Sequence, residues 1–175
     1  THSAVVPIAR RSPAVAYAEP HWQFMVRLLG QVEVVSAEGV SVTFERSKSL
    51  ELVVWLTQHR ERPTRAKARS ALWELQVRDA TFANVVSEAR RSMARVSPPE
   101  HGEEWIGRTM TENLPLGARV VTDADLLSSR VVAARGLLPI EAVEVLRPGL
   151  ELVGGLPFEG TSFLWTDAEG LTSSL

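Results

Sequence analysis

Cysteine is absent from the 175 residues of this chain. Its absence excludes disulfide frameworks, thiolate zinc sites and cysteine nucleophiles, and it fits a reducing compartment, so we expect a cytoplasmic protein. No run approaches the roughly 18 to 20 consecutive apolar residues that a membrane-spanning helix needs, so we expect no membrane contact from this chain. The chain begins at Thr1 rather than at a methionine, and we expect a segment of a longer protein.

The motifs of catalysis and metal binding are also missing. The four histidines lie far apart, with no pair at a spacing of three or four residues, so we expect no metal site. Gly154-Gly155 is not followed by the Lys-Ser/Thr of a phosphate loop, and no nucleophile elbow is present. Asp123 and Asp125 are better explained as a helix cap and a first-turn charge than as a catalytic pair. We therefore expect a protein that is not an enzyme and needs no cofactor.

What the chain does have is a globular composition with segregated charge. Residues 46–95 hold eleven Lys and Arg against five acids, a net charge of +6, whereas residues 96–175 hold five Arg against twelve acids, a net charge of −7. The formal total of −2 hides this separation. A polyanion responds to the local field within about 10 Å at physiological salt. The basic middle is therefore a candidate nucleic-acid surface, and a set of solvated helix faces is the alternative.

The first half of the chain predicts a small antiparallel sheet covered by helices. Residues 1–22 mix Ala, Val and Pro without a sustained period, which is typical of a linker. A strand is expected over 24–29, followed by a hairpin across 37–39 in which alternation buries one face. The buried face would hold Val32, Val34, Val42 and Phe44, and the exposed face Glu33, Ser41, Thr43 and Glu45.

Three helices are expected next, and the third is the most informative. Ser47 begins the first, whose middle LELVVWL is a core segment, and Thr64 caps a second, short one that ends at Trp73. The third runs from its cap Asp79 to Val96, before Pro98-Pro99. At 100° per residue its inward stripe is Phe82, Val85, Val86, Ala89, Met93 and Val96. The outward side is Asn84, Ser87, Glu88, Arg91 and Arg95, with Arg90 on a flank.

Beyond the third helix, residues 105–108 and 113–122 predict two short strands around a turn. Sheet, three helices and then a hairpin is the layout of an α+β winged helix-turn-helix with a C-terminal hairpin wing. From residue 123 the pattern becomes helical and ends at Leu175, which we interpret as the opening of a helical repeat. The expected organisation is a linker over 1–22, a winged-helix domain over 23–122 and part of an all-α domain over 123–175.

The chain resembles a known bacterial family in several segments. These are VRLLGQVEV in the first sheet, RSKSLELVVWL, PTRAKARSALW and FANVVSEARRSMA in the three helices, VVTDADLL at the domain junction, and the tail EVLRPGLELVGGLPFEGTSFLWTDAEG. They are similar to an OmpR/PhoB-type winged helix joined to a bacterial transcriptional activator domain, as in actinobacterial antibiotic regulatory proteins. The chain also resembles the C-terminal region of large actinobacterial proteins with a LysM-type domain and membrane segments upstream. The resemblance implies a transcription regulator with tetratricopeptide-like helices, in a cytosolic position even if the whole protein is membrane-anchored.

On this interpretation the partner is double-stranded DNA, with the third helix in the major groove and the wing on the backbone. The expected base-reading residues are Asn84, Ser87, Glu88 and Arg91. The expected phosphate contacts are Arg65, Lys67, Arg69, Arg90, Arg95 and Arg108. The helical segment is expected to bind a second copy or another protein.

Two departures from the family favour an alternative. Members commonly carry a serine-arginine-leucine-arginine-arginine run in the third helix, where this chain has Ser87-Glu88-Ala89-Arg90-Arg91. An outward carboxylate at Glu88 would repel phosphate and accept only from a cytosine amino group. The wing is also acidic, with Glu103, Glu104 and Glu112 against Arg108 and Arg119. The alternative is a degenerate winged helix that acts as a protein-interaction or signalling module of a larger protein.

Overall fold

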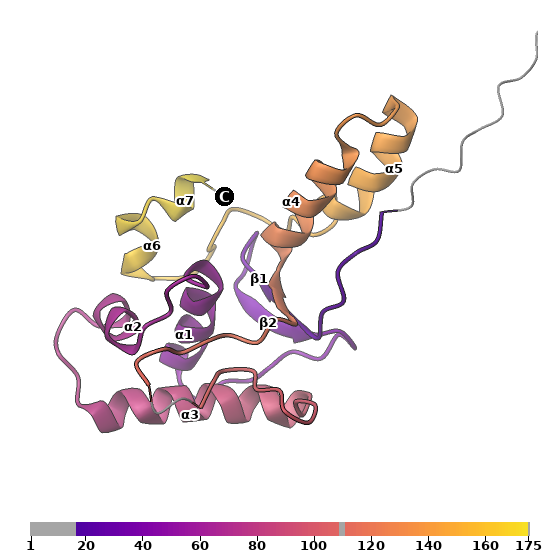
Figure 1. The fold of residues 1–175 in the computed structure, drawn as a ribbon. Helices are drawn as coiled ribbons and strands as arrows, with labels where there is room; N and C mark the ends of the chain where they lie inside the picture. Colours follow the sequence, from indigo (N-terminus) through magenta and orange to yellow (C-terminus); the bar gives the residue numbers. More distant parts are fainter. Residues whose placement is uncertain (1–16, 109–110, 175) are drawn as a thin grey trace, which may run out of the picture.

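The computed structural model describes residues 17–108 and 111–174. Figure 1 shows α3 along one edge of the molecule, with α1 and α2 beside it and the α4–α5 pair projecting away from the sheet. The strands are β1 (Phe24–Arg27), β2 (Glu33–Ser36) and β3 (Val120–Thr122). The helices are α1 (Ser47–Gln58), α2 (Arg65–Leu72), α3 (Asp79–Val96), α4 (Asp123–Ala134), α5 (Pro139–Leu150), α6 (Leu164–Ala168) and α7 (Leu171–Ser174).

The three strands form one mixed sheet in the order β2-β1-β3. β1 pairs antiparallel with β2, so that Phe24 faces Ser36, and parallel with β3, so that Phe24 also faces Val120. The expected pairing of residues 32–34 with 42–44 is reduced to the bridge between Val35 and Ser41 and one hydrogen bond from Val42 N–H to the Val34 carbonyl. Residues 120–122, expected in the wing, instead complete the sheet beside β1.

The main core lies between one face of this sheet and helices α1 and α3. Most of α1 is buried, including Leu52, Val53, Val54 and Leu56 at 0% exposure. Such a helix has hydrophobic side chains on nearly all sides, which explains the continuous apolar run in its sequence. Its N-cap is Arg46 rather than Ser47, and no side chain caps it. The expected cap of α2 is confirmed, because the Thr64 hydroxyl accepts from Lys67 N–H.

The second face of the sheet is also covered, although the alternation of apolar and polar residues predicted that it would be exposed. Met25 and Val35 point away from the main core, yet both are nearly buried because Leu126 of α4 packs on them. The polar positions that were expected to be wet, such as Ser41 and Thr43, are exposed beyond the edge of this contact. The second face of the sheet is therefore buried where α4 crosses it and exposed to solvent elsewhere.

Asp123 does not cap α4, although the sequence predicted this role for it. The N-cap is Thr122, whose hydroxyl accepts from Asp125 N–H while the Asp125 carboxylate accepts from Thr122 N–H. Asp123 is buried, and its carboxylate accepts from Leu28 N–H and Leu29 N–H at 2.9–3.0 Å. Burial raises the pKa of Asp123 and these backbone hydrogen bonds oppose the rise. Asp123 thus fastens α4 to the end of β1 instead of capping its own helix.

After α5 the chain returns to the same end of β1. Gly154 N–H and Gly155 N–H donate to the Leu29 carbonyl at 2.7 and 3.1 Å, and Phe158 N–H donates to the Leu28 carbonyl at 2.8 Å. Gly30 has φ +128°, and a Cβ there would lie 3.0 Å from the backbone of Gly154. This contact places the following α6 against α2 (Figure 1). Glu169, directly after α6, pairs with His59 at the end of α1 at 2.9 Å. No helix in the described part of the chain is long and apolar enough to cross a membrane.

Candidate nucleic-acid interface

Helix α3 has one buried side and one open side, as the sequence predicts. Its N-cap is Arg78, and Asp79 is its first helical residue. Phe82, Val85, Val86, Ala89 and Met93 are buried. Asn84, Arg91 and Arg95 are exposed, and Ser87 is partly exposed. Arg91 has no ion pair or hydrogen bond from its side chain within the described residues. The open side therefore presents an amide, a hydroxyl and guanidinium groups to solvent.

The outward orientation expected for Glu88 is wrong. Glu88 is 1% exposed, and its Oε1 accepts from Glu45 N–H at 2.9 Å and from the Ser92 hydroxyl at 2.6 Å. The backbone before α1 covers this position, so the buried arc of α3 is wider than its apolar stripe. Burial raises the pKa of Glu88, but the Ser49 and Ser92 hydroxyls, Glu45 N–H and the charge of Arg95 together hold it below its ordinary value. The open side of α3 consequently carries no carboxylate at this position, and Glu88 is not available to a base.

Arg90 also faces the protein, and it connects α3 to the wing segment. Its Nε donates to the Ile106 carbonyl at 2.8 Å and its Nη2 to the Gly107 carbonyl at 3.0 Å. Burial lowers the pKa of Arg90, and the charges of Arg108 and Arg65 lower it further. Arg65 of α2 and Arg108 of the wing segment thus both lie within electrostatic range of Arg90 on α3. We call Arg65, Arg90 and Arg108 the arginine cluster.

The three basic side chains of α2 differ in how accessible they are to a ligand. The Arg65 guanidinium lies 5.1 Å from the Phe82 ring centroid, which fixes it over the N-terminal part of α3. Lys67 is exposed, and its ammonium has no partner within the described residues. Arg69 pairs with Asp79 and also donates to the Val77 carbonyl. Arg65 and Lys67 are therefore both free of ion pairs among the described residues, but they lie on different faces of α2, with Lys67 in the same pocket wall as Trp55 and His59. Arg69 instead holds the connection between α2 and α3.

The wing segment is a short ladder rather than the expected regular hairpin. Ile106 and Leu116 form an antiparallel bridge, and Gly107 N–H donates to the Pro115 carbonyl at 2.8 Å. Residues 109–110, at the expected tip, lie outside the described residues. The exposed Arg108 pairs with Glu104 at 3.2 Å, and Arg95 of α3 pairs with Glu45 at 3.5 Å. Both are surface pairs, which contribute little and exchange readily.

One acidic contact at the start of α2 has no signal in the sequence. Glu112 accepts from Ala66 N–H through its Oε1 at 2.6 Å and from Arg65 N–H through its own carbonyl at 2.8 Å. These are first-turn N–H groups of a helix, which otherwise favour an anion such as phosphate. The two partners are more than 40 residues apart in the chain, so no local pattern predicts their contact. Within the described residues, no group of three His, Asp or Glu side chains is placed to hold a metal ion.

No protein-family model and no curated protein matches the chain. Among solved structures, the chain is similar in fold to Mycobacterium tuberculosis EmbR in complex with a low-affinity phosphopeptide, with a TM-score of 0.63 over 87% of this chain. The two sequences are 19% identical, and the matched region is 42% of the EmbR chain. The chain therefore shares with this mycobacterial protein a mixed fold of a small sheet and packed helices, which supports the family resemblance of the sequence at the level of fold.

Proposed function

We propose that residues 23–122 form a winged-helix unit that binds double-stranded DNA and regulates transcription. The single observation that carries this proposal is the open side of α3, where Asn84 and Arg91 are exposed, with Arg65 and Arg108 close enough to Arg90 of the same helix to lower its pKa. Guanidinium groups of this kind hold phosphates, and an exposed amide and guanidinium on a helix are suited to base edges. The fold similarity to EmbR supports the mixed fold of sheet and helices on which the proposal rests.

In the proposed complex α3 enters the major groove with its open side toward the bases. Asn84 pairs with an adenine and Arg91 with a guanine, each contributing about 1–3 kcal/mol of discrimination. Arg65 and Lys67 of α2, together with Arg95 and Arg108, contact phosphates. Arg90 positions the wing segment through two carbonyl groups rather than binding DNA itself. The burial of Glu88 removes the electrostatic objection that the sequence raised.

Fluorescence polarisation of a labelled random-sequence duplex tests the proposal. We expect binding at low salt that weakens as salt rises, because counterions are released from the phosphates. Arg91→Ala is expected to weaken binding about tenfold or more, from the loss of a base or phosphate contact. Arg147→Ala on α5 is the matched control, because Arg147 is exposed and distant in sequence from the interface. Absence of binding at 50 mM salt, or equal effects of the two variants, would refute the proposal.

A specific observation also favours the alternative, a protein-interaction module. Large apolar side chains are exposed on the α4–α5 pair, including Val132 at 60%, Leu138 at 65% and Ile140 at 66%. Exposed apolar surface of this kind is typical of a contact with another protein. Sedimentation of the chain over a range of concentrations would detect self-association, and Ile140→Glu is expected to abolish it. A monomer at all concentrations that binds DNA would exclude self-association as the function.

A further inference from the structure

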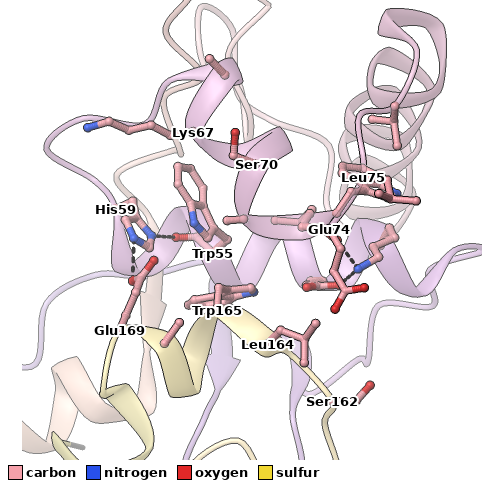
Figure 2. A pocket seen from close by; sticks show the side chains of 18 residues that line it. Trp55, His59, Lys67, Ser70, Glu74, Leu75, Ser162, Leu164, Trp165 and Glu169 are labelled. Atoms are coloured by element: carbon pink, nitrogen blue, oxygen red, sulfur yellow. Dashed lines mark hydrogen bonds and ion pairs between the residues drawn. The ribbon is translucent and has the colours of Figure 1, made fainter.

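His59, the C-cap of α1, contacts the returning C-terminal segment with one ring nitrogen and its own helix with the other. Its Nδ1 lies 2.8 Å from the Trp55 carbonyl oxygen, and its Nε2 lies 2.9 Å from Oε2 of Glu169, directly after α6. Figure 2 shows the ring between these two partners. The backbone N–H of His59 donates to the Leu56 carbonyl at 3.3 Å, so the ring rather than the backbone meets the Trp55 carbonyl. His59 therefore joins two segments that are far apart in the chain.

Both partners of the His59 ring are acceptors without a proton of their own. A neutral imidazole carries one N–H and one lone pair, so it donates to only one of the two. If the proton stays on Nδ1, the lone pair of Nε2 faces a carboxylate oxygen of Glu169 at 2.9 Å, and the two repel each other. An imidazolium has an N–H on each nitrogen and donates to both partners at once. The geometry at His59 is therefore that of a charged ring.

The surroundings of His59 also suit a positive charge. The ring stacks on the Trp55 indole, with centroids 4.1 Å apart and an angle of 11° between the planes, and an aromatic face attracts a cation. The C-terminal end of α1, where His59 lies, carries the negative end of the helix dipole. Arg60, the next residue, donates to the Val120 carbonyl, so its guanidinium is engaged elsewhere. Three features of α1 and α6 thus favour the protonated ring, counting the Glu169 carboxylate.

The other ionisable groups near the ring line the same cavity of about 1170 Å³ between α1, α2 and α6. Lys67 of α2 and Glu74 after α2 are both exposed to water. Glu51 of α1 is buried and pairs with Lys48 at 2.6 Å. Burial raises the pKa of Glu51, while the Lys48 ammonium and the Trp165 indole oppose the rise. Among the described residues, Glu169 is thus the ionisable side chain that contacts the ring.

We propose that His59 and Glu169 form a proton-dependent latch that holds the C-terminal segment from α6 onward on the end of α1. Loss of the ring proton keeps the Trp55 contact and breaks the Glu169 contact, because the lone pair of Nε2 then faces the carboxylate. The latch is closed in mildly acidic solution and opens as the pH rises through neutrality. Helix α6 also lies against α2 and forms one wall of the cavity, so opening loosens that wall. The latch does not depend on the proposed DNA binding and is tested without DNA.

The ring ¹⁵N resonances of His59 report its protonation directly. The full chain is labelled with ¹⁵N, and the imidazole signals are recorded between about pH 5.5 and about pH 8.5, with His59→Gln identifying them by their loss. We expect an imidazolium at the acidic end and a neutral ring protonated on Nδ1 at the basic end, because the Trp55 carbonyl retains that proton. A neutral ring protonated on Nε2, and so still bonded to Glu169, would overturn the proposal.

Hydrogen exchange at position 169 measures the docking of α6. The Glu169 backbone N–H donates to the Trp165 carbonyl at 2.9 Å, so its protection reports whether this segment stays folded in place. After correction for the intrinsic exchange rate, we expect protection to fall about tenfold or more from the acidic to the basic end, the size of one hydrogen bond to a charged group. Glu169→Gln is expected to abolish this fall, because its amide accepts from the protonated ring and donates to the neutral one. Glu51 titrates in both chains, so the comparison isolates the latch.

Asp167→Asn is the matched control for Glu169→Gln. It also replaces one exposed carboxylate of this segment by an amide, and Asp167 accepts from the Thr172 hydroxyl at 3.1 Å instead of contacting His59. We expect this variant to keep the fall in protection seen in the wild type. Equal protection of the wild type at both ends of the pH range, the same fall in Glu169→Gln as in the wild type, or loss of the fall in Asp167→Asn would each overturn the proposal.

Discussion

Replacement of Glu88 tests the placement of α3 most directly. Glu88→Ala removes a buried charged acceptor from Glu45 N–H at 2.9 Å and from the Ser92 hydroxyl at 2.6 Å. A hydrogen bond to a charged group contributes about 1.5–3 kcal/mol, and the two bonds share one oxygen, so we expect a loss of about 3 kcal/mol in the free energy of unfolding. Glu88→Gln keeps an oxygen acceptor of the same size and should lose only about 1 kcal/mol. A domain of this kind is stabilised by about 5–15 kcal/mol, so both losses are measurable.

The pH dependence of these variants gives an independent check. Glu88 has a pKa below its ordinary value in the folded chain, so the unfolded chain binds the proton more tightly. The stabilisation from the ionised carboxylate is therefore fully present above the ordinary glutamate pKa and is lost as the pH falls through the lowered value. The difference in stability between wild type and Glu88→Gln should shrink in that acidic range and stay constant near neutral pH.

Urea unfolding followed by tryptophan fluorescence measures both effects, with the midpoint shifting at constant slope. Glu45→Ala is the control, because the Glu45 side chain is 63% exposed and makes only the surface pair with Arg95 at 3.5 Å. It should change stability by less than about 0.5 kcal/mol. If Glu88→Ala changed stability no more than this control, or if Glu88→Arg folded normally and bound DNA more tightly, Glu88 would lie on the outward face and the packing described here would be wrong.

Four further outcomes follow from individual contacts. Thr122→Ala should cost about 1 kcal/mol in thermal unfolding through the loss of the α4 cap, whereas Thr172→Ala at the exposed C-terminal end should cost almost nothing. Gly30→Ala, which places a Cβ against Gly154 at a positive φ, should cost more than about 1 kcal/mol in the same assay. Lys67→Ala should reduce the salt slope of DNA binding by about 1. Glu112→Gln should raise DNA affinity several-fold at low salt, because it removes a carboxylate charge from the N-terminus of α2; an unchanged affinity would show that this helix end does not meet phosphate.

Local patterns predicted the helices of the first half well. The buried stripe of α3 from Phe82 to Met93 follows from the 3.6-residue period, and the cap at Thr64 follows from its position after Pro63. Both features depend on residues within a few turns of each other. The period and the capping rules therefore suffice for them, with no knowledge of the tertiary structure.

The features that sequence reasoning missed all depend on distant partners. Glu88 is buried because the backbone at Glu45 covers it, and Asp123 is buried because it accepts from Leu28 and Leu29, more than 90 residues earlier. A polar residue on the polar side of a helical wheel is normally exposed, so only the fold reveals such a buried acceptor. β3 was assigned to the wing for the same reason, since its parallel partner β1 lies almost 100 residues away.

Internal contacts also reduce the number of basic side chains that are free to bind DNA phosphates. Six phosphate contacts, as counted from the sequence, would give a slope of log affinity against log salt of about −5. In the structure Arg90 donates to two wing carbonyls, and Arg69 is held by Asp79 and the Val77 carbonyl, so neither is free to pair with a phosphate without breaking internal contacts. The four remaining cations predict a slope of about −3.5. A measured slope of −5 or steeper would mean that Arg69 and Arg90 leave their partners on binding, and α3 and the wing would then have to move relative to each other in the complex.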